Sequence, residues 1–147
     1  MNLPEYISVE EVRKVCEALK LQDWTMRANP QVSTAEAAII LSEVNSEGMA
    51  IDVEAFRQGL EVELEHGLLF KDANVTNNHP ILTGKIVLAH FKESKEYYYR
   101  LEVAELEGDL FKATKAGRAE KAREYYHRLS AARIRLAEVE LKSLEEK

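Results

Sequence analysis

The stretch that decides the fold runs from Gly59 to Leu101. It opens with Gly59-Leu-Glu-Val-Glu-Leu-Glu-His-Gly67, passes through an Asn-rich loop, and resumes with Thr83-Gly-Lys-Ile-Val-Leu-Ala-His-Phe-Lys-Glu93. At about 100° per residue, the apolar side chains of each segment fall on one face of a helix. Both segments are therefore predicted to be helices that contribute to a common core.

Three ionisable residues lie on these apolar stripes where aliphatic side chains would be expected. They are Glu63 on the first helix and His90 and Glu93 on the second, with His66 at the edge of the first stripe. A buried ionisable group has to be paired, neutralised or bound to a metal ion. The pattern therefore predicts a polar site between the two helices.

Helix starts are marked before this stretch. Ser8 and Ser33 each precede a Glu by three residues, which is the pattern of a capping box. Asp52 is the expected N-cap of a helix that ends at His66, with Gly67 as the left-handed residue after it. Trp24 lies in the loop between the first two helices and is expected to fill the core.

The C-terminal part contains few helix breakers. One long helix is predicted from Pro80 to about Lys115, with a kink at Gly108. A turn at Ala116-Gly117 then reverses the chain into a last helix that ends at about Leu144. The expected fold class is all-α, with about five helices and a long C-terminal antiparallel helical hairpin.

Composition sets the broad class of the protein. A chain of 147 residues with 46% hydrophobic and 31% charged residues is long enough for one globular domain. We expect a single domain over 1–147, made of N-terminal helices in 1–50, a core in 51–101 and a hairpin in 102–147. The net charge of −6 argues against a nucleic-acid partner. The chain shows neither a signal peptide nor a run of membrane-spanning length, so a cytoplasmic location is expected.

The polar site has three possible explanations. If the two helices pack antiparallel, Glu63 and His66 could face His90 and Glu93, a ligand set that suits Zn, Fe or Mn. The same residues could instead form a structural network of hydrogen bonds and ion pairs, which we narrowly favour, or line a binding or catalytic pocket. The sequence contains no nucleophile–base pair and no cofactor loop, so an enzyme is the least favoured class.

A second set of polar residues surrounds the Asn-rich loop. Asn74 and Thr76 lie in the loop, and Thr83 and Lys85 begin the helix after it. Their side chains offer hydroxyl, amide and ammonium groups to a ligand, although Asn residues in loops more often make turns through local hydrogen bonds. The spacing around Thr83-Gly-Lys85 is not that of a phosphate loop.

Residues 51–101 resemble a small uncharacterised domain family of bacterial, archaeal and phage proteins. The segments that carry the resemblance are Ile51–Gly67, Asn74-Val-Thr76, Thr83-Gly-Lys-Ile86, Ala89-His90, Glu93, Tyr97-Tyr98 and Arg100-Leu101. Polar residues dominate the positions that match its motifs, which implies a site but identifies no ligand. These positions are Glu63, Glu65, His66, Gly67, Asn74, Thr76, Thr83, Gly84, Lys85, His90 and Glu93. About 25 residues between Trp24 and Ile51 and the C-terminal hairpin depart from the expected pattern.

Two functions are therefore expected. The first is a small protein that binds a divalent metal or another ligand through the Glu/His cluster. The second is a non-catalytic structural or interaction protein of phage origin, which oligomerises or docks a protein partner through the C-terminal hairpin. For a phage-encoded chain the location would be the virion or the host cytoplasm.

Overall fold

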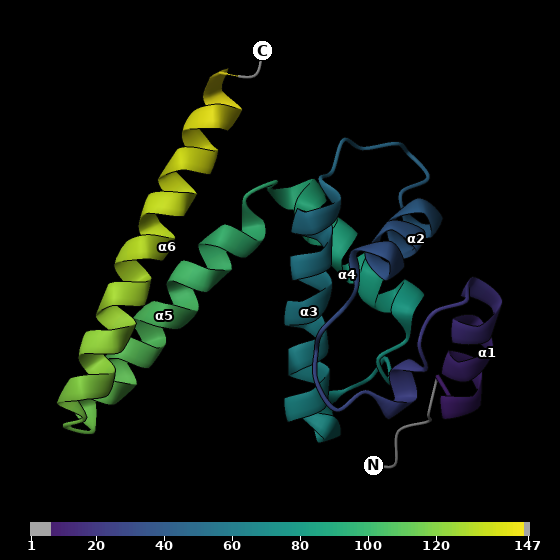
Figure 1. The fold of residues 1–147 in the computed structure, drawn as a ribbon, viewed down its shortest axis with the longest axis horizontal. Helices are drawn as coiled ribbons and strands as arrows, with labels where there is room; N and C mark the ends of the chain where they lie inside the picture. Colours follow the sequence, from purple (N-terminus) through teal and green to yellow (C-terminus); the bar gives the residue numbers. More distant parts are fainter. Residues whose placement is uncertain (1–6, 146–147) are drawn as a thin grey trace. The chain divides into compact units, whose positions relative to one another are not determined.

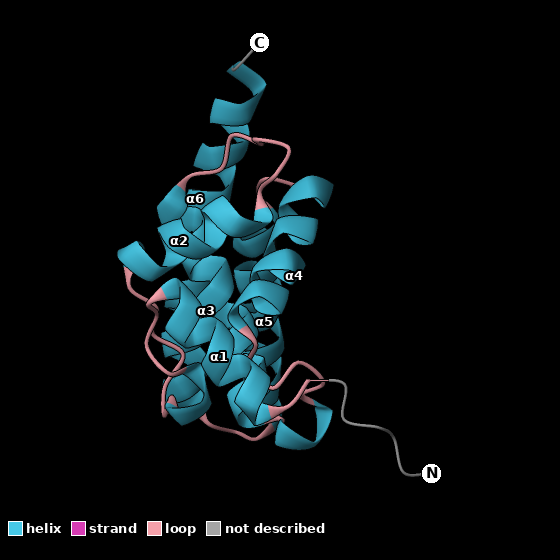
Figure 2. Ribbon diagram, turned by 90° about the vertical axis from the view of Figure 1, so that its right-hand side faces the viewer, coloured by secondary structure: helices cyan, strands magenta, loops and turns pink. Residues whose placement is uncertain are grey.

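A computed structural model describes residues 7–145 of the chain, and these residues form helices joined by loops, with no β-strand among them (Figures 1 and 2). The predicted all-α class is confirmed. The α-helices of the described residues are α1 (Val9–Leu19), α2 (Thr34–Val44), α3 (Val53–Leu69), α4 (Pro80–Glu93), α5 (Tyr97–Lys115) and α6 (Ala119–Glu145), with the 3-10 turns η1 (Trp24–Met26) and η2 (Lys71–Ala73).

The predicted helix starts are confirmed by the capping contacts. The Ser8 side chain accepts a hydrogen bond from the Glu11 N–H at the start of α1. Ser33 and Glu36 form a complete capping box at the start of α2. Asp52 caps α3 by accepting a bond from the Ala55 N–H. These short-range contacts satisfy N–H groups that have no partner within the helix, which is why sequence spacing alone located them.

The prediction of one long helix from Pro80 to Lys115 is wrong. The helix stops at Glu93, and α5 begins at Tyr97 after a short turn. The Ser94 hydroxyl accepts a bond from the Glu96 N–H and donates one to the Glu96 carboxylate, while the Tyr97 N–H bonds to the Ser94 carbonyl. A serine side chain that binds nearby backbone competes with helical hydrogen bonding, so this turn needs neither Gly nor Pro. The helix α5 continues through Gly108 without a break, and the kink expected there stays a prediction.

The chain divides into two compact units, Met1–Glu93 and Ser94–Lys147. The boundary at Ser94 falls inside the span 51–101 that the sequence suggested as a core. The single domain over 1–147 stays a prediction.

The first unit is built around α2, α3 and α4, which contact one another pairwise, while α1 packs against η1 and α4 (Figure 1). Its core is formed by fully buried side chains. These include Val12, Trp24, Ile40, Phe56, Leu60, Leu64 and Val87. The expectation that Trp24 fills the core is confirmed.

The second unit is the hairpin of α5 and α6. Gly117, with φ of 67°, makes the turn between the two helices, as predicted. Leu106, Leu129 and Ala132 form the buried centre of the hairpin. Interhelical ion pairs run along it, Arg133 with Glu107 at 2.6 Å and Arg100 with Glu140 at 2.6 Å.

Of the helices in residues 7–145, none combines the length and the apolar character that crossing a bilayer requires.

Candidate functional site

A small pocket of about 230 Å³ lies in the first unit, between the C-terminal half of α3, the loop that follows it, and the start of α4. This volume is below the roughly 300–1,000 Å³ of pockets that hold drug-sized ligands. The lining residues are Glu63, His66, Gly67, Phe70, Ala73, Asn74, Val75, Thr76, Asn78, Thr83 and Ile86. Carboxylate, imidazole, amide and hydroxyl groups therefore surround a space with an apolar wall.

Asn74 organises the loop wall of this pocket. Its side-chain amide donates to the Gly67 carbonyl at 3.1 Å and to the Asn78 Oδ1 at 2.9 Å, and its own oxygen accepts from the Thr76 hydroxyl at 3.3 Å. Asn77 and Asn78 adopt positive φ angles of 48° and 57°, a region that Asn tolerates better than most residues. The polar loop is thus held in place by its own asparagines, which fixes the side chains that face the pocket.

Gly67 is needed for a reason different from the one predicted. The helix α3 continues to Leu69, so Gly67 lies inside it and is not a left-handed cap. A Cβ at Gly67 would lie 2.1 Å from the Asn78 Oδ1 and 3.0 Å from the Asn74 Nδ2. The glycine therefore lets the asparagine loop lie directly against the helix, and its carbonyl accepts the Asn74 bond.

Glu63 and His90 come together across α3 and α4, with the His90 Nε2 3.6 Å from the Glu63 Oε1. Both side chains are partly buried, at 17% and 27% exposure for Glu63 and His90 respectively. The predicted polar contact between the two helices is therefore present.

The other two predicted metal ligands are not brought to this pair. Because α3 and α4 run antiparallel, His66 lies one turn from Glu63 towards the loop, on the pocket wall that Thr83 also lines. Glu93 lies one turn from His90 in the opposite direction and is exposed, which corrects its predicted core-facing position. Antiparallel register therefore separates the two i,i+3 pairs instead of superimposing them. Among residues 7–145 no group of three or more His, Cys, Asp or Glu side chains is placed to hold a metal ion.

Five of the eight predicted site residues line this pocket: Glu63, His66, Asn74, Thr76 and Thr83. Thr83 is buried and lies in the first turns of α4. Lys85, the remaining predicted ligand-binding residue, is exposed and is not among the residues that line the pocket. The structure thus brings two residues of the Glu/His cluster and three residues of the Asn-rich set to the lining of the same pocket.

His79 has a structural role that sequence reasoning missed. Its Nδ1 accepts hydrogen bonds from the Ile81 and Leu82 N–H groups, at 3.2 and 3.4 Å, so it caps the N-terminus of α4. The side chain is buried, and this burial lowers the pKa of His79 below its ordinary value. A His immediately before a helix-starting Pro was the available signal, since that position is where a cap is expected.

Protonation of His79 is expected to destabilise the first unit. Its pKa is lower in the folded chain than the value of about 6.5 in the unfolded chain, so the unfolded state binds the proton first. Stability is therefore full above about pH 6.5 and falls as the pH drops below it towards the folded pKa. His79→Asn, which keeps a capping side chain, should lose less stability than wild type on acidification.

Denaturant titrations at a series of pH values, followed by the fluorescence of Trp24, would test this. Trp24 is the only tryptophan in the chain, so its signal reports on the first unit. The matched control is His127→Asn, because His127 is exposed on α6 and belongs to the second unit. Equal pH dependence for wild type and His79→Asn would refute the role of His79.

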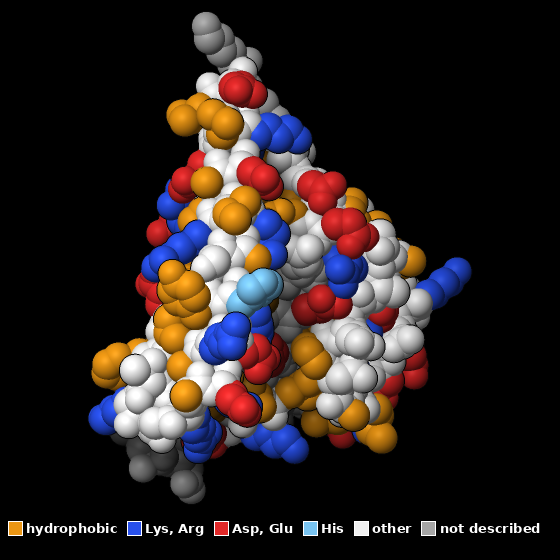
Figure 3. Space-filling model, turned by 60° about the vertical axis from the view of Figure 1, so that its left-hand side comes forward, with side chains coloured by type: hydrophobic (Ala, Val, Ile, Leu, Met, Phe, Trp, Pro, Cys, Tyr) orange, Lys and Arg blue, Asp and Glu red, His pale blue; other side chains and the backbone are white. Residues whose placement is uncertain are grey.

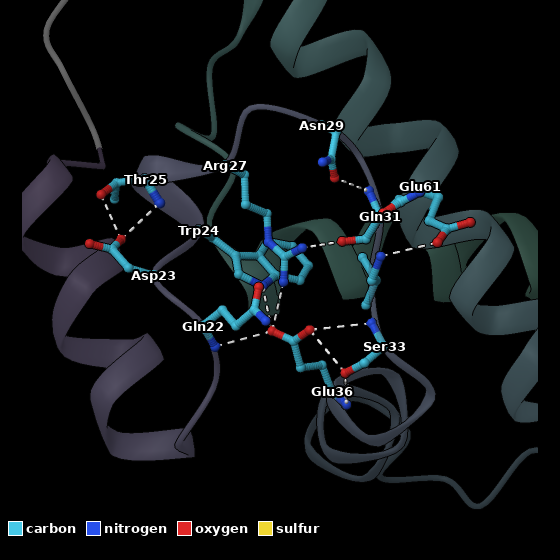
Figure 4. Close-up of polar contacts among 11 residues, drawn as sticks. Gln22, Asp23, Trp24, Thr25, Arg27, Asn29, Gln31, Ser33, Glu36 and Glu61 are labelled. Carbon is cyan, nitrogen blue, oxygen red and sulfur yellow. Dashed lines mark hydrogen bonds and ion pairs between the residues drawn. The ribbon is translucent and has the colours of Figure 1, made fainter.

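A second polar cluster holds the loop between α1 and α2 (Figure 4). Glu36 is buried, and its Oε1 accepts bonds from the Arg27 guanidinium at 2.7 Å, the Gln22 N–H at 3.1 Å and the Trp24 indole at 3.3 Å. Its Oε2 accepts from the Ser33 N–H and hydroxyl. Burial alone would raise the pKa of Glu36, but the Arg27 charge and these hydrogen bonds outweigh it and leave the pKa lowered.

Arg27 is as deeply buried as Glu36, with side-chain exposures of 7% and 8%. Its guanidinium lies over the Trp24 ring at 5.0 Å and also donates to the Gln31 carbonyl. The partners of Glu36 hold residues 22–36 in place. The buried Arg27 Nε has no hydrogen-bond partner among the described residues, and a pocket of about 580 Å³ lies beside this network, with Arg27, Glu36 and Glu61 in its lining. Residue spacing does not predict this network, because a Glu three residues after Ser33 is fully explained by a capping box.

Taken together, the helices, the loop and the pocket define a small all-α protein whose first unit carries several pockets, one of which is lined by five of the predicted site residues. The family model described as Protein of unknown function (DUF5661) matches residues 12–107, about two thirds of the chain, and the chain belongs to this family. The match runs from α1 into α5 and includes the segment 25–50, so it is broader than the resemblance over 51–101. No curated protein and no solved structure matches the chain.

Proposed function

We propose that this protein binds a small ligand carrying an amine or another cationic group in the pocket between α3 and α4. The observation that carries the proposal is the convergence of Glu63, His66, Asn74, Thr76 and Thr83 on one space. These residues come from two helices and a loop, and a pocket with a few convergent polar groups on an apolar wall is the usual form of a small-molecule site.

The charge of the lining supports a cationic ligand. Among the described residues that line the pocket, Glu63 supplies the one carboxylate, and none is Lys or Arg. Asn74, Asn78, Thr76 and Thr83 add oxygen atoms that accept hydrogen bonds. An ammonium group that donates to Glu63 would make charge-assisted bonds, while a short carbon chain would contact Phe70, Val75 and Ile86.

Thermal unfolding and calorimetric titration with a series of small primary amines, from methylamine to butylamine and ethanolamine, test this proposal. A ligand that binds only the folded state raises the melting temperature. Glu63→Gln is expected to weaken binding by about tenfold or more, because a hydrogen bond to a charged group contributes about 1.5–3 kcal/mol. The matched control is Glu65→Gln, since Glu65 is exposed on the same helix. Binding that is unchanged in Glu63→Gln, or no binding at millimolar amine, contradicts the proposal.

Metal binding by the same residues is decided by elemental analysis of protein purified without chelator. Glu63 and His90 would supply two metal-ligand atoms, the Glu63 Oε1 and the His90 Nε2, which lie 3.6 Å apart. A metal ion held there would need water or other groups to complete the four ligands usual for Zn. Near-stoichiometric Zn, Fe or Mn that is lost in His90→Ala would support this alternative, and amine binding would then have to be measured in the metal-free protein.

A second candidate function is assembly through the C-terminal hairpin. It is supported by large apolar side chains that are exposed on α6, among them Ile134, Leu141 and Leu144. Removal of these side chains should abolish assembly without changing the effect of amines on the melting temperature. The two candidate functions are therefore separable by experiment.

A further inference from the structure

The helix α6 has two apolar faces, and the hairpin buries only one of them. Leu129 and Ala132 face α5 and are almost completely buried. On a different side of the helix, Ile134, Leu141 and Leu144 are 61%, 59% and 80% exposed. Figure 3 shows hydrophobic side chains recurring along the helix that leads down from the C-terminal end. An amphipathic helix with a second apolar stripe has a face suited to another helix.

The exposed stripe has the spacing of a coiled-coil seam. Ser130, Ile134, Ala137, Leu141 and Leu144 follow one another in alternate steps of four and three residues, which is the a/d pattern of a heptad repeat. These five residues are called the α6 seam below. None of them belongs to the buried cluster of the hairpin. The seam therefore offers knobs and holes to a partner helix on the side away from α5.

We propose that the α6 seam pairs antiparallel with the α6 seam of a second copy of this chain. In that orientation Ile134 faces Ala137 of the second copy, and Leu141 faces Ser130. Ile134 and Leu141 then each meet a small side chain, while Leu144 lies opposite His127, so the two helices can approach closely at the centre of the seam. A parallel pair would instead place Ile134 on Ile134 and Ala137 on Ala137, which alternates crowded and empty layers.

Charge complementarity favours the same arrangement. Arg133 and Glu140 flank the seam on one side, and in the antiparallel register Arg133 of each copy lies beside Glu140 of the other. Each side chain already forms an ion pair within its own hairpin, Arg133 with Glu107 and Glu140 with Arg100, and both remain partly exposed, at 55% and 38%. Because the pair is two-fold symmetric, the contact between Arg133 and Glu140 occurs twice. In a parallel pair Arg133 would approach Glu138 of the other copy, but Glu140 would approach Glu145, so attraction at one contact is offset by repulsion at the other.

The inference rests on the second candidate function and is independent of the pocket. It also accounts for the small core of the second unit, in which two helices share Leu106, Leu129 and Ala132 as their buried cluster. Two such hairpins, paired through α6, would cover the apolar face that each leaves open. A second copy is the occupant that the spacing and the charges of the seam fit.

Light scattering coupled to size-exclusion chromatography of the full chain tests self-association. We expect a dimer at about 100 μM protein, which corresponds to a dissociation constant in the micromolar range. Ile134→Glu combined with Leu141→Glu should give a monomer with unchanged helical circular dichroism, because both positions are exposed in the monomer. Phe111→Glu is the matched control: Phe111 is 66% exposed but lies on α5, outside the seam, so this variant should remain dimeric. A monomeric wild type, or a dimer that survives the paired substitution, overturns the inference.

Cysteine cross-linking tests the orientation. Ser130→Cys and Leu141→Cys are made separately, mixed and oxidised; the native Cys16 is 2% exposed and takes no part. An antiparallel pair gives disulfides between the two different variants. In that arrangement two Ser130 positions lie about 16 Å apart along the helix axis, at 1.5 Å per residue, which is too far for a disulfide. Disulfides formed by Ser130→Cys alone overturn the antiparallel register. Amine binding, measured on the same proteins, is unaffected by either outcome, so failure of this inference is distinct from failure of the pocket.

Discussion

Replacing Glu36 with alanine will lower the free energy of unfolding of the first unit by about 3–5 kcal/mol. Removal of one partner from a buried ion pair leaves the other charge uncompensated, and this is strongly destabilising. Here the remaining charge is Arg27, which is 7% exposed. The Trp24 indole and the Gln22 N–H also lose their acceptor. Denaturant titration followed by Trp24 fluorescence measures the loss directly.

Two further variants show whether the buried charge is the cause. Glu54→Ala removes an exposed carboxylate that bonds to Thr34 and Arg57, and it should change the stability by no more than about 1 kcal/mol. The double variant Arg27→Met/Glu36→Gln removes both charges and leaves an amide oxygen as acceptor, so it should recover part of the stability lost in Glu36→Ala. If Glu36→Ala costs no more than Glu54→Ala, the network does not hold the loop.

The starts of α1, α2 and α3 could be predicted because they depend on contacts between residues two or three positions apart. Ser8, Ser33 and Asp52 bond to N–H groups in the next turn, so sequence spacing contains the whole signal. The Ser94 turn is equally local but was missed. A serine is compatible with a helix interior, and its competing bond to the Glu96 N–H has no distinctive spacing.

The sequence predicted most of the residues that line the candidate site, but not which of them lie next to one another. Helical periodicity placed Glu63 and His90 on facing stripes, and the structure brings them together. Which neighbours join them depends on the register of α3 against α4, which is a tertiary property. That register moves His66 towards Asn74 and Thr83 and leaves Glu93 on the surface. The pairing of Arg27 with Glu36 is likewise set by how a loop folds back, for which the sequence holds no periodic signal.

Gly84 shows how a glycine can be required for packing without binding a ligand, and its replacement is the second substitution with a large expected effect. Gly84→Ala will destabilise the first unit by about 1–3 kcal/mol, although alanine is the better helix former by about 1 kcal/mol. A Cβ at this position would lie 2.5 Å from the Ile40 Cγ2 and 3.3 Å from the Val44 Cγ1. Ile40 is fully buried and, as a β-branched residue in a helix, has one strongly preferred rotamer, so α2 and α4 would have to move apart.

The matched control is Gly108→Ala, the same chemical change in the middle of α5. No atom lies within 4 Å of a Cβ built at Gly108, so the substitution gains helix propensity without a clash. It should stabilise the second unit by about 0.5–1 kcal/mol. Trp24 fluorescence measures the first variant, and helical circular dichroism the second. A lower free energy of unfolding for Gly84→Ala and a higher one for Gly108→Ala would show that Gly84 is needed for the close approach of α2 to α4. If Gly84→Ala also stabilised the protein, that packing explanation would fail, and a role for the Gly84 backbone in ligand binding would become the better account.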